Sequence, residues 1–288
     1  MPLAAANGIE IYHETVGDPA DPTLLLITGL GAQMLTWDAE LCRAFADRGF
    51  HVVRYDNRDV GLSTHLEGDI DVLSLLAGQG VPVPYRISDM AADAVGLLDH
   101  LGVDRAHLVG VSMGGMIAQA VAIEHPARVR SLTSIMSTTG EPHVGAPTAE
   151  AMQALLAPPA QTAEESADTL VMHAHVWGSP GLFDEARLRR LAHAVWERNR
   201  DPMGSARQLA AILASGSRAD GLRALDVPTL VIHGTEDRLV QPSGGERTAE
   251  LVPDAKLLVV EGMGHDLPKP LWPRLVDAIT AHAAEHDG

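Results

Sequence analysis

Val109-Gly110-Val111-Ser112-Met113-Gly114-Gly115-Met116 contains the pattern Gly-x-Ser-x-Gly, and the residues on either side of it determine the fold that we expect. The apolar run 107–111 is typical of a buried strand, and residues 113–125 have a helical pattern. The two glycines allow a tight, strained turn from strand to helix that a β-carbon would obstruct. Such a turn lifts the Ser112 hydroxyl above a sheet, so Ser112 is the candidate nucleophile.

The rest of the sequence repeats this alternation of strand and helix. Asn7-Gly8, between two apolar-polar alternations, predicts an antiparallel hairpin at the start of the chain. Short apolar runs predict further buried strands at 24–27, 51–55, 132–136, 230–232 and 257–260, and helical patterns cover most of the intervals, at 36–48, 88–101, 244–252 and 270–284. The expected fold is therefore α/β, with a mostly parallel, doubly wound sheet.

One interval, from Gly140 to Gly221, lacks strand patterns. Its helical patterns cover 149–156, 162–175, 184–198 and 203–214. We expect a core formed by residues 1–140 and 221–288, with an inserted helical cap at 141–220. The alternative is an independent helical domain, but the flanking strands continue one alternation and favour an insertion.

The composition limits the partners. The chain has 21 basic and 38 acidic residues, and its net charge of −17 would repel the phosphates of a nucleic acid. No run reaches the ~20 apolar residues that span a bilayer, and the first residues lack the basic and apolar regions of a secretory signal. We expect a cytoplasmic protein that binds neither nucleic acid nor membrane. The sequence does not predict an oligomeric state.

We expect neither metal nor cofactor. His173 and His175 lie two residues apart on a predicted helix, so they point to different sides, and no third ligand is evident. The single cysteine, Cys42, lies in a predicted amphipathic helix, where a buried structural role is the commoner one.

A serine nucleophile needs a base, and an acid that orients the base. Among 14 histidines, His265 is the best candidate, because it follows the last predicted strand in a glycine-flanked loop. Glu236 and Asp237 follow another strand, and we prefer Asp237, partly on the family pattern given below. Asp266 is a poor orienter because immediate sequence neighbours seldom point at each other.

The oxyanion of a tetrahedral intermediate needs backbone donors. We expect these to be the N–H of Met113, after the nucleophile, and the N–H of Leu30, in a glycine-rich loop after an early strand. The predicted substrate pocket is apolar, although many of its side chains could equally belong to the core. Its candidates are Gly29, Leu30, Met34, Leu35, Trp37, Met113 and Met116, with Trp177 and Trp196 from the cap.

Taken together, these motifs resemble the α/β-hydrolase superfamily, and within it the bacterial esterase branch that includes the aclacinomycin methylesterases. The resemblance covers nearly the whole chain and includes the segment 55–63, His233-Gly234-x-x-Asp237 and Gly262-Met263-Gly264-His265. It implies a catalytic triad of Ser112, Asp237 and His265. Thr28 stands where many relatives carry histidine before the oxyanion glycine. Asp56 and Arg58, in the segment 55–63, are expected to support that loop rather than to react.

The predicted activity is hydrolysis of a carboxylic ester of a small hydrophobic substrate through an acyl-enzyme. Serine in place of aspartate at position 112 argues against haloalkane dehalogenase and epoxide hydrolase chemistry. A lactonase, a perhydrolase, a carbon-carbon bond hydrolase or an acyltransferase would use the same triad. A ligand-binding protein without activity is a further alternative, which the complete set of catalytic groups disfavours.

Overall fold

A computed structural model describes residues 2–199 and 201–287 of the chain. These residues form an eight-stranded sheet with the order β1-β2-β4-β3-β5-β6-β7-β8. β1 pairs antiparallel with β2, and β2 pairs antiparallel with β4, while the remaining pairs are parallel. The strands are β1 (Leu3–Ala6), β2 (Ile9–Val16), β3 (Thr23–Ile27), β4 (His51–Tyr55), β5 (Ala106–Val111), β6 (Val129–Ile135), β7 (Thr229–Gly234) and β8 (Lys256–Val260).

The predicted hairpin and the six predicted strand runs are all present. Asn7 and Gly8 connect β1 to β2 with positive φ angles of 47° and 79°, which a two-residue hairpin turn favours. β3 shows why the central strands are continuously apolar. Leu25 and Ile27 pack in one hydrophobic cluster and Leu24 and Leu26 in another, so the strand is covered on both faces.

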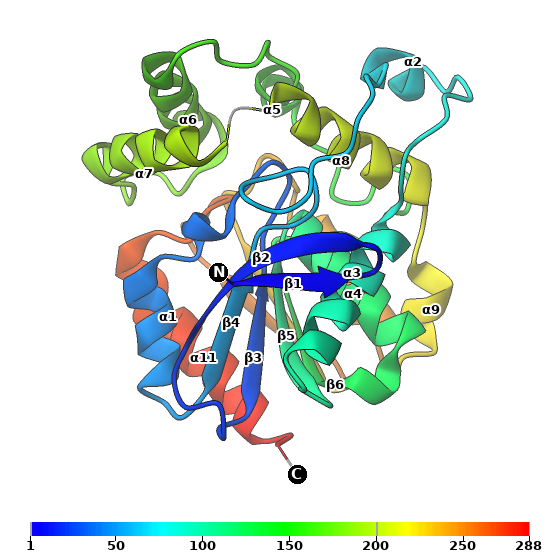
Figure 1. Ribbon diagram of the computed structural model, residues 1–288, viewed down its shortest axis with the longest axis vertical. Coiled ribbons are helices and arrows are strands. Elements are labelled where there is room, and N and C mark those ends of the chain that lie inside the picture. The colour runs from blue at the N-terminus through cyan, green and yellow to red at the C-terminus, as the bar shows by residue number, and fades with distance from the viewer. Residues whose placement is uncertain (1, 200, 288) are drawn as a thin grey trace.

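Helices lie on both sides of the sheet (Figure 1). Buried residues of α3 and α4 belong to the first cluster, and those of α1 and α11 belong to the second. This arrangement confirms the predicted doubly wound α/β fold. The α-helices other than α5 to α8 are α1 (Ala39–Ala46), α2 (Val72–Leu76), α3 (Ile87–His100), α4 (Met113–Glu124), α9 (Ala219–Arg223), α10 (Ser243–Leu251) and α11 (Trp272–Ala284), with short 3₁₀ turns at η1 (Met34–Thr36), η2 (Pro126–Arg128) and η3 (Lys269–Leu271).

Of the five described helices between β6 and β7, the first four, here called the cap helices, lie together at one end of the sheet (Figure 1). They are α5 (Ala149–Leu155), α6 (Ala163–Trp177), α7 (Glu185–Arg198) and α8 (Pro202–Ser215). Each helix is preceded by an N-cap residue whose side chain accepts a hydrogen bond from a backbone N–H of the first turn. These N-cap residues are, in order, Thr148, Thr162, Asp184 and Asp201. All four predicted helical patterns are therefore present, while the domain boundaries at 141–220 stay a prediction.

Two short helices were not predicted. α2 is five residues long and has no buried residue, so it is too short to show the apolar periodicity that identifies a helix. α9 is five residues long and contributes Ala219 and Leu222 to the core. Among the described residues, no helix combines the length and the apolar character that crossing a bilayer would require.

Candidate active site

Ser112 occupies the turn between β5 and α4. Its φ of 56° and ψ of −120° lie outside the regions that non-glycine residues favour, so the backbone is strained there. The neighbouring glycines are required by close contacts. A β-carbon on Gly110 would lie 2.1 Å from the carbonyl oxygen of Gly114, and one on Gly114 would lie 2.2 Å from that of Ile27. Strand and helix thus meet too closely for any residue but glycine at either position.

The predicted acid and base are brought together. Asp237 follows β7 and His265 follows β8, so both stand at the carboxyl edge of the sheet where Ser112 stands. His265 Nδ1 lies 2.7 Å from Asp237 Oδ2. The other carboxylate oxygen accepts the N–H groups of Leu239 and Val240, each at 2.9 Å. Asp237 is 3% exposed, whereas Glu236 is exposed.

The charge of Asp237 is stabilised despite its burial. Burial alone would raise the pKa of this carboxyl group. The positive charge that His265 can carry, together with hydrogen bonds from His233 and His265, outweighs that effect and lowers the pKa to about 2. The carboxylate is therefore ionised at neutral pH and can orient the imidazole of His265.

Ser112 and His265 both line one cavity. Among the described residues, Ser112 Oγ has no hydrogen-bond partner, so the hydroxyl is open toward this cavity rather than already bonded to His265. Such a contact commonly tightens only when a substrate fills the site.

The predicted oxyanion loop passes beside Ser112. A β-carbon on Gly29 would lie 3.2 Å from the β-carbon of Ser112. Among the described residues, the N–H groups of Leu30 and Met113 have no hydrogen-bond acceptor, although Met113 is fully buried. Buried backbone donors are normally paired, so two unpaired ones beside Ser112 are available to a negatively charged oxygen.

The segment around Asp56 supports this loop, as expected. The buried Asp56 carboxylate accepts the N–H of Met34 at 2.7 Å and the N–H of Leu62 at 3.0 Å. Asn57 Nδ2 donates to both the carbonyl and the hydroxyl oxygen of Thr28, at 3.1 and 3.0 Å. Thr28, the departure from the family pattern, therefore takes part in the support of the loop.

The cavity has a volume of about 920 Å³ and lies between the sheet edge and the cap helices. The predicted pocket residues that line it are Gly29, Leu30, Trp37, Met116 and Trp177, whereas those that do not are Met34, Leu35, Met113 and Trp196. Met34 is fully buried beside the loop, and its backbone is fixed by Asp56. The additional apolar lining, which the sequence did not identify apart from Trp177, includes Leu155, Leu170, Trp177, Leu182, Phe183, Leu188, Leu191, Leu209, Ile212 and Leu213.

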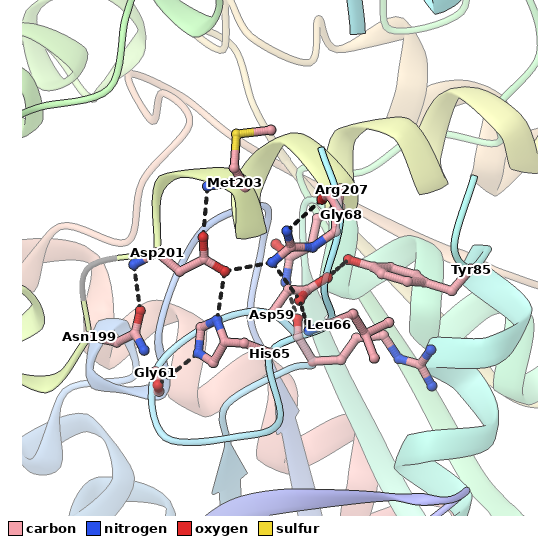
Figure 2. Close-up of polar contacts among 12 residues, drawn as sticks. Asp59, Gly61, His65, Leu66, Gly68, Tyr85, Asn199, Asp201, Met203 and Arg207 are labelled. Carbon is pink, nitrogen blue, oxygen red and sulfur yellow. Dashed lines mark hydrogen bonds and ion pairs between the residues drawn. The ribbon is translucent and has the colours of Figure 1, made fainter. Parts of the chain in front are cut away.

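Within the described part of the chain, two groups of side chains have the spacing of cation ligands. In one, formed by Asp59, His65 and Asp201, Arg207 donates to both carboxylates, and His65 contacts the Asp201 carboxylate (Figure 2). The other is His282, Glu285 and His286 at the end of α11, and Lys256 pairs with the carboxylate of this group. In both groups a cationic side chain already balances a carboxylate.

His173 and His175, which the sequence analysis considered and rejected as ligands, lie against aromatic rings. The ring of His173 stacks on Trp177 at 4.2 Å, and that of His175 meets Phe183 edge-on at 4.8 Å.

Comparison with known proteins identifies the family. A family model described as "alpha/beta hydrolase fold" matches residues 22–268, so the chain belongs to the α/β-hydrolase family. The chain is 30% identical to rhodomycin D methylesterase DnrP of Streptomyces peucetius, over 95% of both chains. The predicted resemblance to the methylesterase branch is thereby confirmed, and an ester hydrolase is supported.

Other matches are broader. The chain is 27% identical to 3-oxoadipate enol-lactonase 2 of Acinetobacter baylyi, over 89% of this chain and 86% of the relative. The crystal structure of the esterase RhEst1 from Rhodococcus sp. ECU1013 superposes with a TM-score of 0.76 at 21% identity, covering 99% of this chain and 100% of that one. This structural similarity establishes the shared fold.

Proposed function

We propose that this protein hydrolyses a carboxylic ester through an acyl-enzyme on Ser112. The observation that carries the proposal is the 2.7 Å contact between His265 Nδ1 and Asp237, on the same cavity as the strained, unpaired Ser112. Because Nδ1 donates to the carboxylate, Nε2 of His265 has its lone pair free to take a proton.

The reaction follows from these positions. Ser112 Oγ attacks the ester carbonyl while His265 takes its proton, and the N–H groups of Leu30 and Met113 stabilise the oxyanion. The intermediate then expels the alcohol, which receives the proton from His265. A water molecule, activated by the same imidazole, attacks the acyl-enzyme and releases the acid.

The cavity favours an ester of a large hydrophobic acid as the substrate. Its volume of about 920 Å³ is near the upper end of the range for small-molecule sites, and its cap side is largely apolar. With the 30% identity to a rhodomycin D methylesterase, this size favours a methyl ester of a bulky polycyclic acid. The relative named as an enol-lactonase makes lactone opening by the same triad the second candidate.

A serine-directed phosphonate tests the chemistry. We expect the probe to label wild-type protein once and to leave Ser112→Ala unlabelled, as determined by intact mass. Failure to label the wild type, or equal labelling of Ser112→Ala, would contradict the proposal. A panel of methyl esters and lactones of graded acid size then tests the substrate class, since faster turnover of small lactones would favour the second candidate.

A further inference from the structure

A cap side chain holds the oxyanion loop. Gln208, on α8, is fully buried. Its Oε1 accepts the N–H of Gly31 at 2.8 Å, and its Nε2 donates to the carbonyl of Arg58 at 2.7 Å. One partner can only donate and the other can only accept, so the orientation of the amide is fixed. The residue held in this way directly follows Leu30, whose N–H is a proposed oxyanion donor.

The oxyanion loop needs such support. Gly31 has a φ of 66°, a conformation that glycine reaches easily and leaves easily. A β-carbon on Gly31 would lie 2.6 Å from Ser205 Oγ, so α8 rests directly on the loop. Without Gln208, the N–H of Gly31 would lose its acceptor and the loop could rotate the Leu30 donor away from Ser112.

A second cap segment, which follows α6, holds the loop of the catalytic histidine. His265 N–H donates to the carbonyl of Trp177 at 2.6 Å, and Gly264 N–H donates to Ser179 Oγ at 2.9 Å. The hydroxyl of Ser179 in turn donates to Asp266 Oδ1 at 2.5 Å, and the N–H of Ser179 reaches the same oxygen at 2.9 Å. Ser179 is fully buried. Three consecutive residues of the histidine loop are therefore fixed by the cap.

We propose that Gln208 and Ser179 are positioning residues, through which the cap sets the geometry of the oxyanion loop and of the His265 loop. The inference rests on the proposed function, because it assigns these two residues to the same reaction. It makes the cap a part of the catalytic apparatus as well as a wall of the substrate cavity. The effect of each residue passes through backbone groups, since neither side chain reaches Ser112.

Kinetics of three single variants test the proposal. Gln208→Met and Ser179→Ala should each lower kcat by about 10-fold or more, with KM within about 2-fold of wild type, because the transition state needs the aligned loops more than the bound substrate does. Arg189→Met is the control, since it lies on the cap helix α7, makes only exposed ion pairs and does not line the cavity. Its kcat should stay within about 2-fold of wild type.

A transition-state analogue separates positioning from general damage. The affinity of Gln208→Met for an alkyl boronic acid, which forms a tetrahedral adduct with serine, should fall by the same factor as kcat/KM. Its affinity for the product acid should stay within about 2-fold of wild type. Equal losses for both ligands would show a distorted cavity and would overturn the assignment.

Amide hydrogen exchange of the protein without substrate provides a readout independent of catalysis. Exchange at Gly31 should become about 10-fold faster in Gln208→Met, and exchange at Gly264 about 10-fold faster in Ser179→Ala, while Arg189→Met leaves both unchanged. Unchanged exchange, or faster exchange with normal kcat, would overturn the proposal. If Ser112→Ala retained ester turnover, the proposed function would fail instead, and the exchange results would still report the contacts of the cap.

Discussion

On the core side of the cavity, the conformation of the backbone positions the candidate reactive groups. The cap side contributes apolar side chains and contacts between distant segments. On the core side, Ser112 stands on a strained turn, and the proposed oxyanion donors are N–H groups. On the cap side, Gln208 meets Gly31 across 177 positions in sequence, and Ser179 meets Gly264 across 85. The turn that carries the candidate nucleophile is therefore encoded by neighbouring residues. The alignment of the loops around it and the shape of the substrate cavity depend on contacts between distant residues.

Loss of the nucleophile should have the largest effect of any single change. Ser112→Ala is expected to lower kcat/KM for methyl esters by roughly 10⁴-fold or more, because the oxyanion donors and the cavity remain but no acyl-enzyme can form. The free energy of unfolding, measured in urea, should change by less than about 1 kcal/mol. Turnover within 10-fold of wild type would place the nucleophile elsewhere on the core side.

Asp237→Asn should rank next. The asparagine amide would favour the wrong tautomer of His265, and kcat should fall roughly 10²- to 10⁴-fold. Glu236→Gln is the matched control, because that residue is adjacent but exposed and should retain normal kcat. A large loss of kcat in Glu236→Gln, together with a small loss in Asp237→Asn, would show that Glu236 rather than Asp237 orients His265.

A cap variant should change selectivity rather than chemistry. Leu170→Trp would narrow the cavity from the α6 side, so kcat/KM for a bulky acid should fall about 10- to 100-fold while a short acyl ester changes little. The ratio of the two values measures the effect. Equal losses for both esters would mean that this part of the cap acts on the reacting groups, which would weaken the distinction between the two sides.

The ionic attachment of α8 should matter for stability. Arg207, with a side chain 4% exposed, pairs with Asp59 and Asp201 at 2.9 and 2.5 Å (Figure 2). Arg207→Met would leave the buried Asp59 without this partner and should lower the free energy of unfolding by about 3 kcal/mol, as measured in urea. Arg189→Met, in an exposed pair with Glu185 on α7, should cost less than about 1 kcal/mol. If both variants lost a similar free energy of unfolding, the burial of the Arg207 ion pairs would not explain their effect on stability.

The smallest predicted effect is a dependence of stability on pH. The pKa of Asp237 falls from 3.8 to about 2 on folding, so its ionised form stabilises the folded state above pH 3.8. That contribution, roughly 2 kcal/mol, should be lost as the pH falls from 3.8 toward 2. Asp237→Asn should show a shallower decline over this interval in urea titrations. If the free energy of unfolding fell equally in wild type and Asp237→Asn, the loss of stability would come from other carboxyl groups.

The sequence predicted those features that depend on neighbouring residues. The turn at Ser112 is encoded by the adjacent Gly110 and Gly114, and the buried strands are encoded by continuous apolar runs. Asp237 and His265 became candidates because each follows a strand, and the parallel sheet brings their loops to one edge. The preference for Asp237 over the adjacent Glu236 rested partly on the family pattern.

Features that depend on distant contacts were missed. Met34 was predicted to line the cavity but lies outside its lining, because a side chain's direction in an irregular loop depends on the whole packing around it. Gln208 and Ser179 belong to no motif, since a polar residue on a helix or beyond its end is usually solvated. Their partners follow only from the docking of the cap.

The two attachments of the cap to the loops also bear on how such enzymes diversify. A chimera that carries the cap of another relative would receive a new substrate cavity. The N–H groups of Gly31 and Gly264 would lose their hydrogen-bond acceptors unless the transplanted cap had equivalents of Gln208 and Ser179. Recombination of caps should therefore succeed most often when these two contacts are transplanted with the helices.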